Sequence, residues 1–163
     1  TNVGSDLRIY DNYALLDLDG LGSIGSVGGD CYVAWNLAMT DLDGLLALSS
    51  VGADLDVARH PLITEVDGLS QLSWVGGDFH VRDNALLVEL NGLSGLQWTG
   101  SDLLIADNDS LSDLSGLSTL NSVGHDLDIT GNASLCESYA SAAVAHIQVA
   151  GYLNIHGNTG SCP

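Results

Sequence analysis

Residues 75–98 read VGGDFHVRDNALLVELNGLSGLQW, and units of the same pattern follow one another along the chain. Their first residues lie 24 positions apart: Val3, Val27, Val51, Val75, Thr99 and Val123. A fixed period of this length is typical of solenoids, in which each repeat forms a coil that buries its apolar face only against its neighbours. We therefore expect one repeat domain over residues 1–163, with a long regular surface that suits binding.

Two spacings within the repeat predict its local structure. Positions five and seven are apolar and alternate with polar neighbours, as in Leu127-Asp128-Ile129, which predicts a short strand. Positions 13, 16, 19 and 22 are apolar at a spacing of three, which predicts extended or 3₁₀ segments because it is too tight for an amphipathic helix. The glycine at position 18, for example Gly44 or Gly68, suits a corner with positive φ.

Position ten carries an asparagine in nearly every repeat, and His60 is the one departure. We expect these side chains to stack inside a turn and to bond the backbone of the next coil. Asn108 and Asn132 also begin N-glycosylation sequons. We interpret both sequons as chance matches, since both asparagines belong to the inward ladder.

The sixth repeat departs from the pattern after Leu135, and we expect residues 136–163 to form a C-terminal cap. A short helix over the open end of the stack is predicted there by the helical spacing of Ala140, Ala143, Val144 and Ile147. A last strand from Tyr152 to His156 would follow it. The first repeat has no such element, so an upstream segment or another subunit is expected to cover it.

The motif V-G-G-D-L-x-I-x-x-N-x-x-L-x-x-L-x-G-L-x-x-L resembles the leucine-rich repeat family, and more closely its receptor L domain variant in bacterial and fungal surface proteins. The resemblance covers nearly the whole chain. It implies a mainly β fold, a right-handed parallel β-solenoid of about seven coils. It also implies a secreted or cell-surface setting and a binding role, with no catalytic residues. The repeat departs from an ordinary leucine-rich repeat at its opening, where Val stands four residues before the strand Leu.

The charge balance restricts the partners. The chain has 3 basic residues, none of them lysine, against 21 acidic ones, and its formal net charge is −18. Nucleic acid and anionic membranes are therefore not expected as partners, because both require a basic surface. No stretch approaches about 20 unbroken apolar residues, so membrane insertion is not expected either.

Many of the acidic residues recur at fixed positions of the repeat. Position four holds Asp6, Asp30, Asp54, Asp78, Asp102 and Asp126. We expect these carboxylates to accept backbone N–H bonds from the glycine-rich turn before them. Calcium between the coils is the alternative, although the known calcium-loop motifs do not occur. We assign no metal site and no cofactor.

The cysteines predict one disulfide. Cys136 and Cys162 occupy position 14 of adjacent coils, which places their Cα atoms about 5 Å apart and within bonding range. Such a bridge indicates an oxidising compartment. Cys31 replaces leucine at position five, so we expect a buried thiol that fills the core.

No catalytic constellation is evident. The sequence contains no nucleophile elbow, phosphate loop, zinc spacing or His-Glu metal motif. Its carboxylates recur by column, as structural side chains do, whereas a catalytic pair should be a local exception. We expect a protein without enzymatic activity.

Positions six, eight and nine are expected to face outward from the strands and their exits. All three arginines of the chain lie there, among residue types that are enriched in binding hot spots. We predict a ligand-binding face made of Arg8, Tyr10, Tyr32, Trp35, Arg59, His80 and Arg82, with a cation–π contact between Trp35 and Arg59. The alternative is that these positions are unconstrained surface.

Trp74 and Trp98 both occupy position 24 and should stack on each other. They form a second candidate patch, either a partly buried corner or an exposed aromatic strip.

These observations favour an extracellular recognition or adhesion module that binds a protein or carbohydrate through its sheet face. The alternative is a structural subunit that binds itself end to end and builds a surface filament or sheath, which the open first coil would permit. The expected helix at the other end argues against simple stacking of coils.

Overall fold

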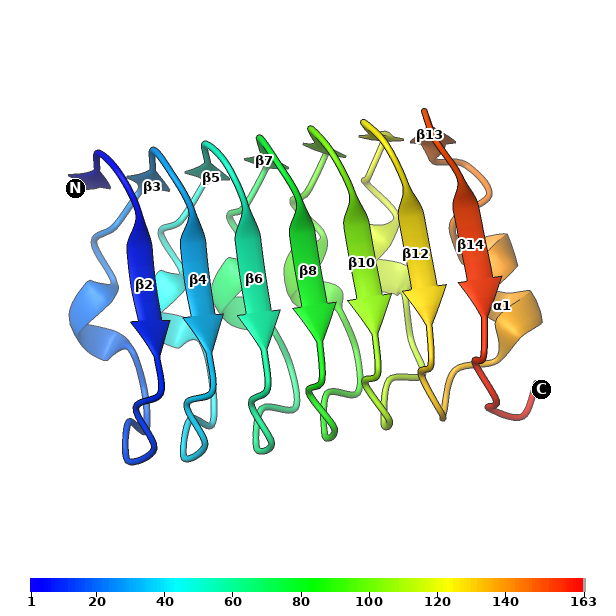
Figure 1. Ribbon diagram of the computed structural model, residues 1–163, viewed down its shortest axis with the longest axis horizontal. Helices are drawn as coiled ribbons and strands as arrows, with labels where there is room; N and C mark the ends of the chain where they lie inside the picture. The colour runs from blue at the N-terminus through cyan, green and yellow to red at the C-terminus, as the bar shows by residue number, and fades with distance from the viewer. Residues whose placement is uncertain (163) are drawn as a thin grey trace.

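The computed structural model describes residues 1–162. Within them, successive repeats stack side by side and build two parallel seven-stranded sheets, with 3₁₀ turns on the opposite side from the larger sheet and one α-helix near the C-terminus (Figure 1). The fold is therefore mainly parallel β and solenoid-like, as the 24-residue period predicts.

The main sheet has four-residue strands in the order β14-β12-β10-β8-β6-β4-β2. Their bounds are β2 (Leu7–Tyr10), β4 (Cys31–Ala34), β6 (Leu55–Ala58), β8 (Phe79–Arg82), β10 (Leu103–Ala106), β12 (Leu127–Thr130) and β14 (Leu153–His156). The second sheet has two-residue strands: β1 (Asn2–Val3), β3 (Ser26–Val27), β5 (Ser50–Val51), β7 (Trp74–Val75), β9 (Trp98–Thr99), β11 (Ser122–Val123) and β13 (Gln148–Val149). The 3₁₀ turns are η1 (Asp19–Leu21), η2 (Asp43–Leu45), η3 (Asp67–Leu69), η4 (Asn91–Leu93) and η5 (Ser115–Leu117), at the apolar spacing of three that predicts them.

The strand register places equivalent positions of neighbouring repeats next to each other. Val33 of β4, for example, pairs with Ile9 on one side and with Val57 on the other. Positions five and seven point inward and form one continuous apolar core with the leucines around the 3₁₀ turns. Each fully buried leucine or valine contributes about 1.5–3 kcal/mol of stability, so the core is built up repeat by repeat.

The predicted asparagine ladder forms, but its side chains bond the backbone of the preceding coil rather than that of the next one. Asn108 is buried, its Nδ2 donates to the Val81 carbonyl at 3.0 Å, and its Oδ1 accepts the N–H of Asn84 at 3.1 Å. His60 takes the same place in its repeat, with Nε2 3.0 Å from the carbonyl oxygen of Val33. Burial lowers the pKa of His60, so the ring is neutral at pH 7. Asn132 is buried like Asn108, which agrees with reading both sequons as chance matches.

The glycine at position 18 was predicted to form a corner with positive φ, and this reason for the glycine is wrong. Among the described residues, the glycines with positive φ are Gly131 and Gly157, not those of this column. Gly44 and Gly68 lie inside 3₁₀ turns, where a Cβ would overlap the backbone carbonyls of Leu18 and Leu42 in the preceding repeat. Glycine is needed there because consecutive turns stack backbone against backbone.

The acidic ladder at position four is satisfied by backbone, but from a different donor than predicted. The Asp54 Oδ1 accepts the N–H of Asp78 at 2.9 Å, and the Asp78 Oδ1 accepts that of Asp102 at 3.0 Å. The donor is thus the equivalent aspartate of the next repeat rather than the glycine-rich turn of the same repeat. The ladder ties neighbouring repeats together at the start of the main-sheet strands.

The C-terminal segment forms the predicted helix, α1 (Glu137–Ala143), which packs behind β14 (Figure 1). The helical spacing extends to Ile147, but the helix ends at Ala143 because the chain returns to β13 at Gln148. Val144 and Ile147 are nevertheless buried. The helix thus packs on the core through Ala140, but Leu153 of β14 is 48% exposed, so the predicted cover over the open end of the stack is incomplete.

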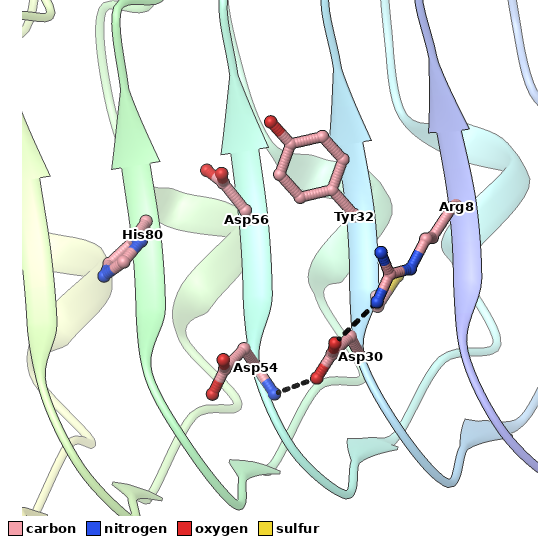
Figure 2. Close-up of a pocket in the computed structure, with 7 residues that line it drawn as sticks. Arg8, Asp30, Tyr32, Asp54, Asp56 and His80 are labelled. Carbon is pink, nitrogen blue, oxygen red and sulfur yellow. Dashed lines mark hydrogen bonds and ion pairs between the residues drawn. The ribbon is translucent and has the colours of Figure 1, made fainter.

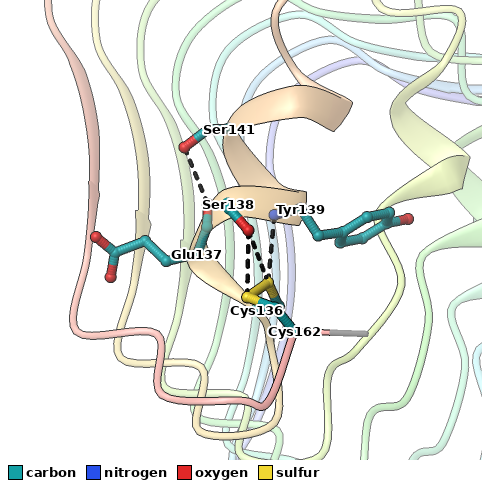
Figure 3. The surroundings of a disulfide bond; sticks show 6 residues. All are labelled: Cys136, Glu137, Ser138, Tyr139, Ser141 and Cys162. Atoms are coloured by element: carbon teal, nitrogen blue, oxygen red, sulfur yellow. Dashed lines mark hydrogen bonds between the residues drawn. A yellow bond between two sulfur atoms is a disulfide. The ribbon is translucent and has the colours of Figure 1, made fainter.

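A disulfide joins Cys136, at the start of α1, to Cys162, with a Cα–Cα distance of 5.0 Å that agrees with the prediction (Figure 3). The Ser138 hydroxyl lies 3.2 Å from each sulfur. Within residues 1–162, no helix is long and apolar enough to cross a membrane.

Candidate functional site

A cavity of about 180 Å³ lies on the outer face of the main sheet, over β2, β4, β6 and β8 (Figure 2). It brings together three residues of the predicted binding face, Arg8, Tyr32 and His80. It adds residues that the sequence analysis did not assign to this face: Asp30, Cys31, Asp54 and Asp56.

The strand register explains why these side chains meet. Position six of four consecutive repeats holds Arg8, Tyr32, Asp56 and His80, and each is the direct pairing partner of the next across the sheet. Neighbouring parallel strands lie about 4.8 Å apart, so the four side chains form one continuous row. Asp30 and Asp54 belong to the acidic ladder just before β4 and β6, and they line the lower side of this row in Figure 2.

Arg8 is held by two carboxylates. Its Nη2 atom lies 3.0 Å from Asp6 Oδ2 and 3.0 Å from Asp30 Oδ2. The Arg8 side chain is more than half exposed, so each ion pair contributes little stability and serves mainly to fix the position of the guanidinium. The positive charge of Arg8 is therefore already balanced within the cavity wall.

Asp56 is the least expected member of the site. It is only 8% exposed, and its Oδ2 pairs with Arg82 Nη2 at 2.9 Å. Its Oδ1 is buried and has no hydrogen-bond partner among residues 1–162. An unpaired buried polar atom costs about 1–3 kcal/mol, so this carboxylate stands out from the other acidic residues. The sequence places Asp56 at outward position six, between Tyr32 and His80, but it gives no signal for the burial of this side chain, which depends on neighbours from adjacent repeats.

Aromatic rings flank the cavity. Tyr10 and Tyr32 pack edge to face, with ring centroids 5.9 Å apart and an interplanar angle of 83°. This geometry suits the charge distribution of the rings. Tyr10 remains 51% exposed, so an aromatic surface continues from the cavity to the edge of the sheet.

Position nine has a conformation that the sequence analysis missed. Trp35 and Arg59 have φ values of 58° and 61°, in the left-handed region that bulky residues rarely adopt. Asp11, Asp83 and Asp107 share this conformation, and glycine follows in the later repeats. The preference of the column for Asp and Gly was the available signal. Trp35 and Arg59 are its two exceptions.

The predicted contact between these two exceptions is present. The Arg59 Cζ lies 4.8 Å from the centroid of the Trp35 ring, which is cation–π geometry, and Arg59 also pairs with Asp83 at 3.3 Å. Trp35 is 42% exposed. The pair therefore offers an aromatic surface near the ends of β4 and β6.

Position eight is less available than predicted. Ala34, Ala58 and Ala106 are buried. Tyr10 and Arg82 are its accessible members on β2 and β8, and Arg82 is engaged by Asp56 and Asp83. Position eight, which was predicted to face outward, therefore does not expose every side chain, since on β4, β6 and β10 it carries a buried alanine.

Trp74 and Trp98 stack as predicted, with centroids 5.3 Å apart and planes 6° from parallel. They belong to β7 and β9 of the second sheet, away from the cavity residues. Trp98 is 40% exposed and Trp74 is partly buried, so the pair is both a packed corner and an exposed strip.

Two further features, a cluster of possible cation ligands and the buried thiol of Cys31, are explained by their immediate surroundings. The ligand atoms of Asp102, His125 and Asp126 lie within 4.8 Å of one another. His125 Nδ1 lies 2.7 Å from Asp102 Oδ1, and this hydrogen bond raises the pKa of His125, which favours the charged form of the imidazole beside the acidic ladder. Cys31 is buried, and burial raises the pKa of its thiol to about 12, which keeps it protonated and unreactive at pH 7.

No family model, curated protein or solved structure matches this chain. The site is therefore interpreted from its own geometry.

Proposed function

We propose that this protein is a non-enzymatic recognition module that binds a protein or a carbohydrate through the outer face of β2, β4, β6 and β8. One observation carries the proposal: the cavity of about 180 Å³ in which Arg8, Tyr32, Asp56 and His80 meet from four repeats. In a repeat protein, core columns are constrained by packing, whereas a cluster of unlike polar and aromatic residues on one face is typical of a binding surface.

The surroundings of the cavity support this assignment. Tyr10 and Trp35 are exposed aromatic side chains on the same side of the molecule, and Arg59 stacks on Trp35. Tyrosine, tryptophan and arginine dominate binding energy in interfaces, especially where they surround a pocket. A partner that fills the cavity and extends toward the ends of β2 and β4 would therefore reach these rings as well.

In this proposal the fold is a right-handed solenoid of the receptor L domain type, with about seven coils, and the protein is secreted or displayed on a cell surface. The disulfide between Cys136 and Cys162 supports an oxidising compartment. The formal charge of −18 without any lysine supports a partner other than nucleic acid.

The test begins with immobilised glycans and peptides of defined composition, probed with the intact protein. Any ligand found is then measured against Trp35→Ala and Tyr32→Ala, with Trp74→Ala as the matched aromatic control on the other sheet. We expect the first two variants to lose binding and the control to keep it. Loss of binding in the Trp74→Ala variant alone would place the active surface on the second sheet and refute the proposal.

A second candidate, end-to-end self-assembly, is favoured by one observation. Leu7 and Ile9 of β2 are only partly buried, and so is Ile155 of β14 at the other end of the same sheet. Leu7 and Ile9 occupy the same repeat positions as Leu153 and Ile155, so a second copy would continue the core columns. Light scattering over a concentration series tests this alternative: growing rods would support it, and a constant monomer mass would contradict it.

A further inference from the structure

Exposed apolar side chains follow the ends of the main-sheet strands in the first four repeats. The chain leaves each strand through a β-turn with positions 11 and 12 at its corner, and the N–H of Met39 closes one such turn by donating to the Asn36 carbonyl at 3.1 Å. The turns line up along the lower edge of Figure 1, and neighbouring repeats are bonded there, as where the N–H of Val88 donates to the Thr64 carbonyl at 2.9 Å. We define the turn stripe as the large apolar residues exposed at positions 11, 12 and 14: Tyr13, Leu16, Leu37, Leu62, Leu86 and Val88.

The fold does not require the turn stripe. Its six side chains are between 41% and 62% exposed, so they contribute little to the core. The fifth repeat forms the same β-turn, closed by the N–H of Leu111 and the carbonyl of Asn108 at 3.0 Å, with Asp109, Ser110 and Ser112 at positions 11, 12 and 14. Polar side chains therefore suffice for the turn. A row of exposed apolar residues with polar neighbours is typical of an interaction surface.

Acidic residues border the turn stripe along its length. Position 15 directly follows the stripe in the chain and forms an acidic rim in the same four repeats: Asp17, Asp41, Glu65 and Glu89. Within residues 1–162, none of these four carboxylates pairs with a basic side chain. The charge of Asp67 is the main cause that raises the pKa of Glu65, as expected where carboxylates lie together without a counter-ion. The turn stripe therefore lies beside uncompensated negative charge.

The acidic rim selects among the possible occupants of the turn stripe. A second copy of this chain would bring its own rim and a net charge of −18 against the first, and like charges repel. An anionic membrane is disfavoured for the same reason. A polypeptide with lysine or arginine beside its apolar residues would cover the stripe and pair with the rim at the same time.

The spacing of the repeats favours a helix over an extended segment. Successive coils lie about 4.8 Å apart, so the three steps between the four turns add up to about 14 Å. An α-helix presents its apolar face once per turn, about every 5.4 Å, and falls out of step with the coils by about 2 Å over this length. A strand presents one face about every 6.6 Å and falls out of step by about 5 Å. Strand addition would also need free backbone groups, whereas the stripe offers side chains.

We propose that the turn stripe binds a basic amphipathic helix of a partner polypeptide, with the apolar face of the helix on the stripe and its basic side chains on the acidic rim. The turn stripe contains none of the residues that line the main-sheet cavity. The proposal therefore goes beyond the function proposed above and does not rest on it.

The test measures by calorimetry how the intact protein binds synthetic peptides of about 14 residues, a length that spans about 20 Å as a helix. The first peptide has leucine at helical spacing and lysine elsewhere. The second has the same composition with leucine and lysine alternating, and the third has glutamate in place of lysine. We expect the first peptide to bind, and the other two to bind at least about tenfold more weakly, because one lacks the helical apolar face and the other the positive charge.

Variants of the turn stripe can use a residue that the repeat already accepts. Leu62→Ser together with Leu86→Ser copies Ser110 of the fifth repeat and should weaken the first peptide by about tenfold or more, since two apolar contacts are lost. Leu46→Ser is the matched control, because Leu46 is 44% exposed but follows the 3₁₀ turn η2, outside the stripe. It should change the affinity less than about twofold. Both proteins should keep the melting temperature of the parent to within a few degrees, as expected for surface substitutions.

A second pair of variants tests the acidic rim. At about 0.15 M salt the Debye length is about 8 Å, so only charges close to the helix should matter. Glu65→Gln should weaken the first peptide by about threefold. Asp128→Asn removes the same charge from β12, outside the rim, and should leave the affinity unchanged.

Several outcomes would overturn the helix site. These are equal binding of the helical and alternating peptides, equal binding of the basic and acidic peptides, equal losses in the double variant and in Leu46→Ser, or no binding of any peptide. A dimer seen by light scattering and lost in the double variant would assign the stripe to a second copy. Binding to phosphatidylcholine vesicles that is lost in the double variant would assign it to a lipid surface.

The variant Tyr32→Ala separates the turn stripe from the main-sheet face. We expect it to bind the first peptide like the parent, because Tyr32 lines the cavity and is not part of the stripe. Loss of the peptide in Tyr32→Ala, with no loss in the Leu62 and Leu86 double variant, would overturn the helix site and leave recognition by the main-sheet face standing.

Discussion

At the scale of single residues, the register of the main sheet decides which side chains are ordinary surface and which are not. Asp56 and Asp128 both occupy position six, but Asp56 is buried beside Tyr32 and Arg82, whereas Asp128 is partly exposed and bonds to Asn154 at 2.7 Å. The same residue type at the same position therefore has two different energetic roles.

Arg82 should matter more for folding than Arg8. Arg82→Ala would leave the buried carboxylate of Asp56 without its 2.9 Å partner, and we expect a loss of about 2 kcal/mol in the free energy of unfolding. Arg8→Ala removes only exposed ion pairs and should cost less than about 1 kcal/mol. Urea unfolding of both variants measures the difference, and equal losses would contradict it.

The sequence placed Arg82 in the ligand-binding face and Asp56 at an outward position, but it did not predict that the two form an ion pair with a buried carboxylate. A repeat pattern tells which columns point outward, whereas burial on the outward face depends on neighbours from adjacent repeats. The contact between Trp35 and Arg59 could be predicted because it needs only that two long side chains be neighbours in one column.

At the scale of elements, the 3₁₀ turns stack so closely that a side chain at position 18 has no room. The repeat pattern predicted both the turns and the glycine, but it could not give the reason for the glycine. A single sequence shows only that glycine is required. The structure is needed to tell whether positive φ or close backbone approach is the reason.

The close approach of the 3₁₀ turns predicts different losses of stability for the same substitution at position 18 of two repeats. Gly68→Ala should destabilise the protein by about 1–3 kcal/mol, because the added Cβ overlaps the Leu42 carbonyl. Gly20→Ala should be nearly neutral, since no atom of the described chain lies within 4 Å of a Cβ added there. Thermal unfolding tests the pair. Similar melting temperatures for the two variants would contradict this prediction. They would show that neighbouring 3₁₀ turns can move apart to accommodate the added methyl group without loss of stability.

The junction between α1 and the preceding repeat should depend on pH. Asp113 Oδ1 accepts the N–H of Ser115 at 2.7 Å and the hydroxyl of Tyr139 at 2.7 Å, and these bonds hold the pKa of Asp113 below its usual value. A lowered carboxyl pKa stabilises the folded state above the unfolded value of about 3.9, and this stabilisation is lost as the pH falls through the folded value.

Tyr139→Phe removes one of the two hydrogen bonds that lower this pKa. We therefore expect the variant to be less stable than the parent at neutral pH, with a difference that shrinks as the pH falls below about 4. Urea unfolding at a series of pH values measures it. A difference that stays constant with pH would mean that Tyr139 acts through packing alone.

At the scale of the whole molecule, the period of 24 residues and the spacings within the repeat predicted the solenoid, the short strands, the 3₁₀ turns, the asparagine ladder and the disulfide, because each is a property of a column. The helix was predicted from the interruption of the pattern, and the parallel arrangement of the strands from the resemblance to leucine-rich repeats. The cavity could not be predicted in this way, since it arises where four consecutive repeats carry different residues at position six. The single domain and the binding face as a whole remain predictions.

The acidic ladder should be stable without calcium. Its carboxylates accept backbone N–H bonds from the next repeat, from Asp6 through Asp126, and these bonds offset the repulsion between neighbouring charges. The melting temperature in chelator should equal that in millimolar calcium at matched ionic strength. A rise that calcium causes and magnesium does not would show that the ladder binds a cation.

The most direct test of the recognition function is to map a ligand found on the glycan or peptide arrays by amide chemical shifts of the isotope-labelled protein. We predict that the largest changes fall on β2, β4, β6 and β8, centred on Tyr32 and Asp56. Changes centred on Trp74 and Trp98, or on the edge of the first repeat, would contradict it, as would the absence of any ligand on both arrays.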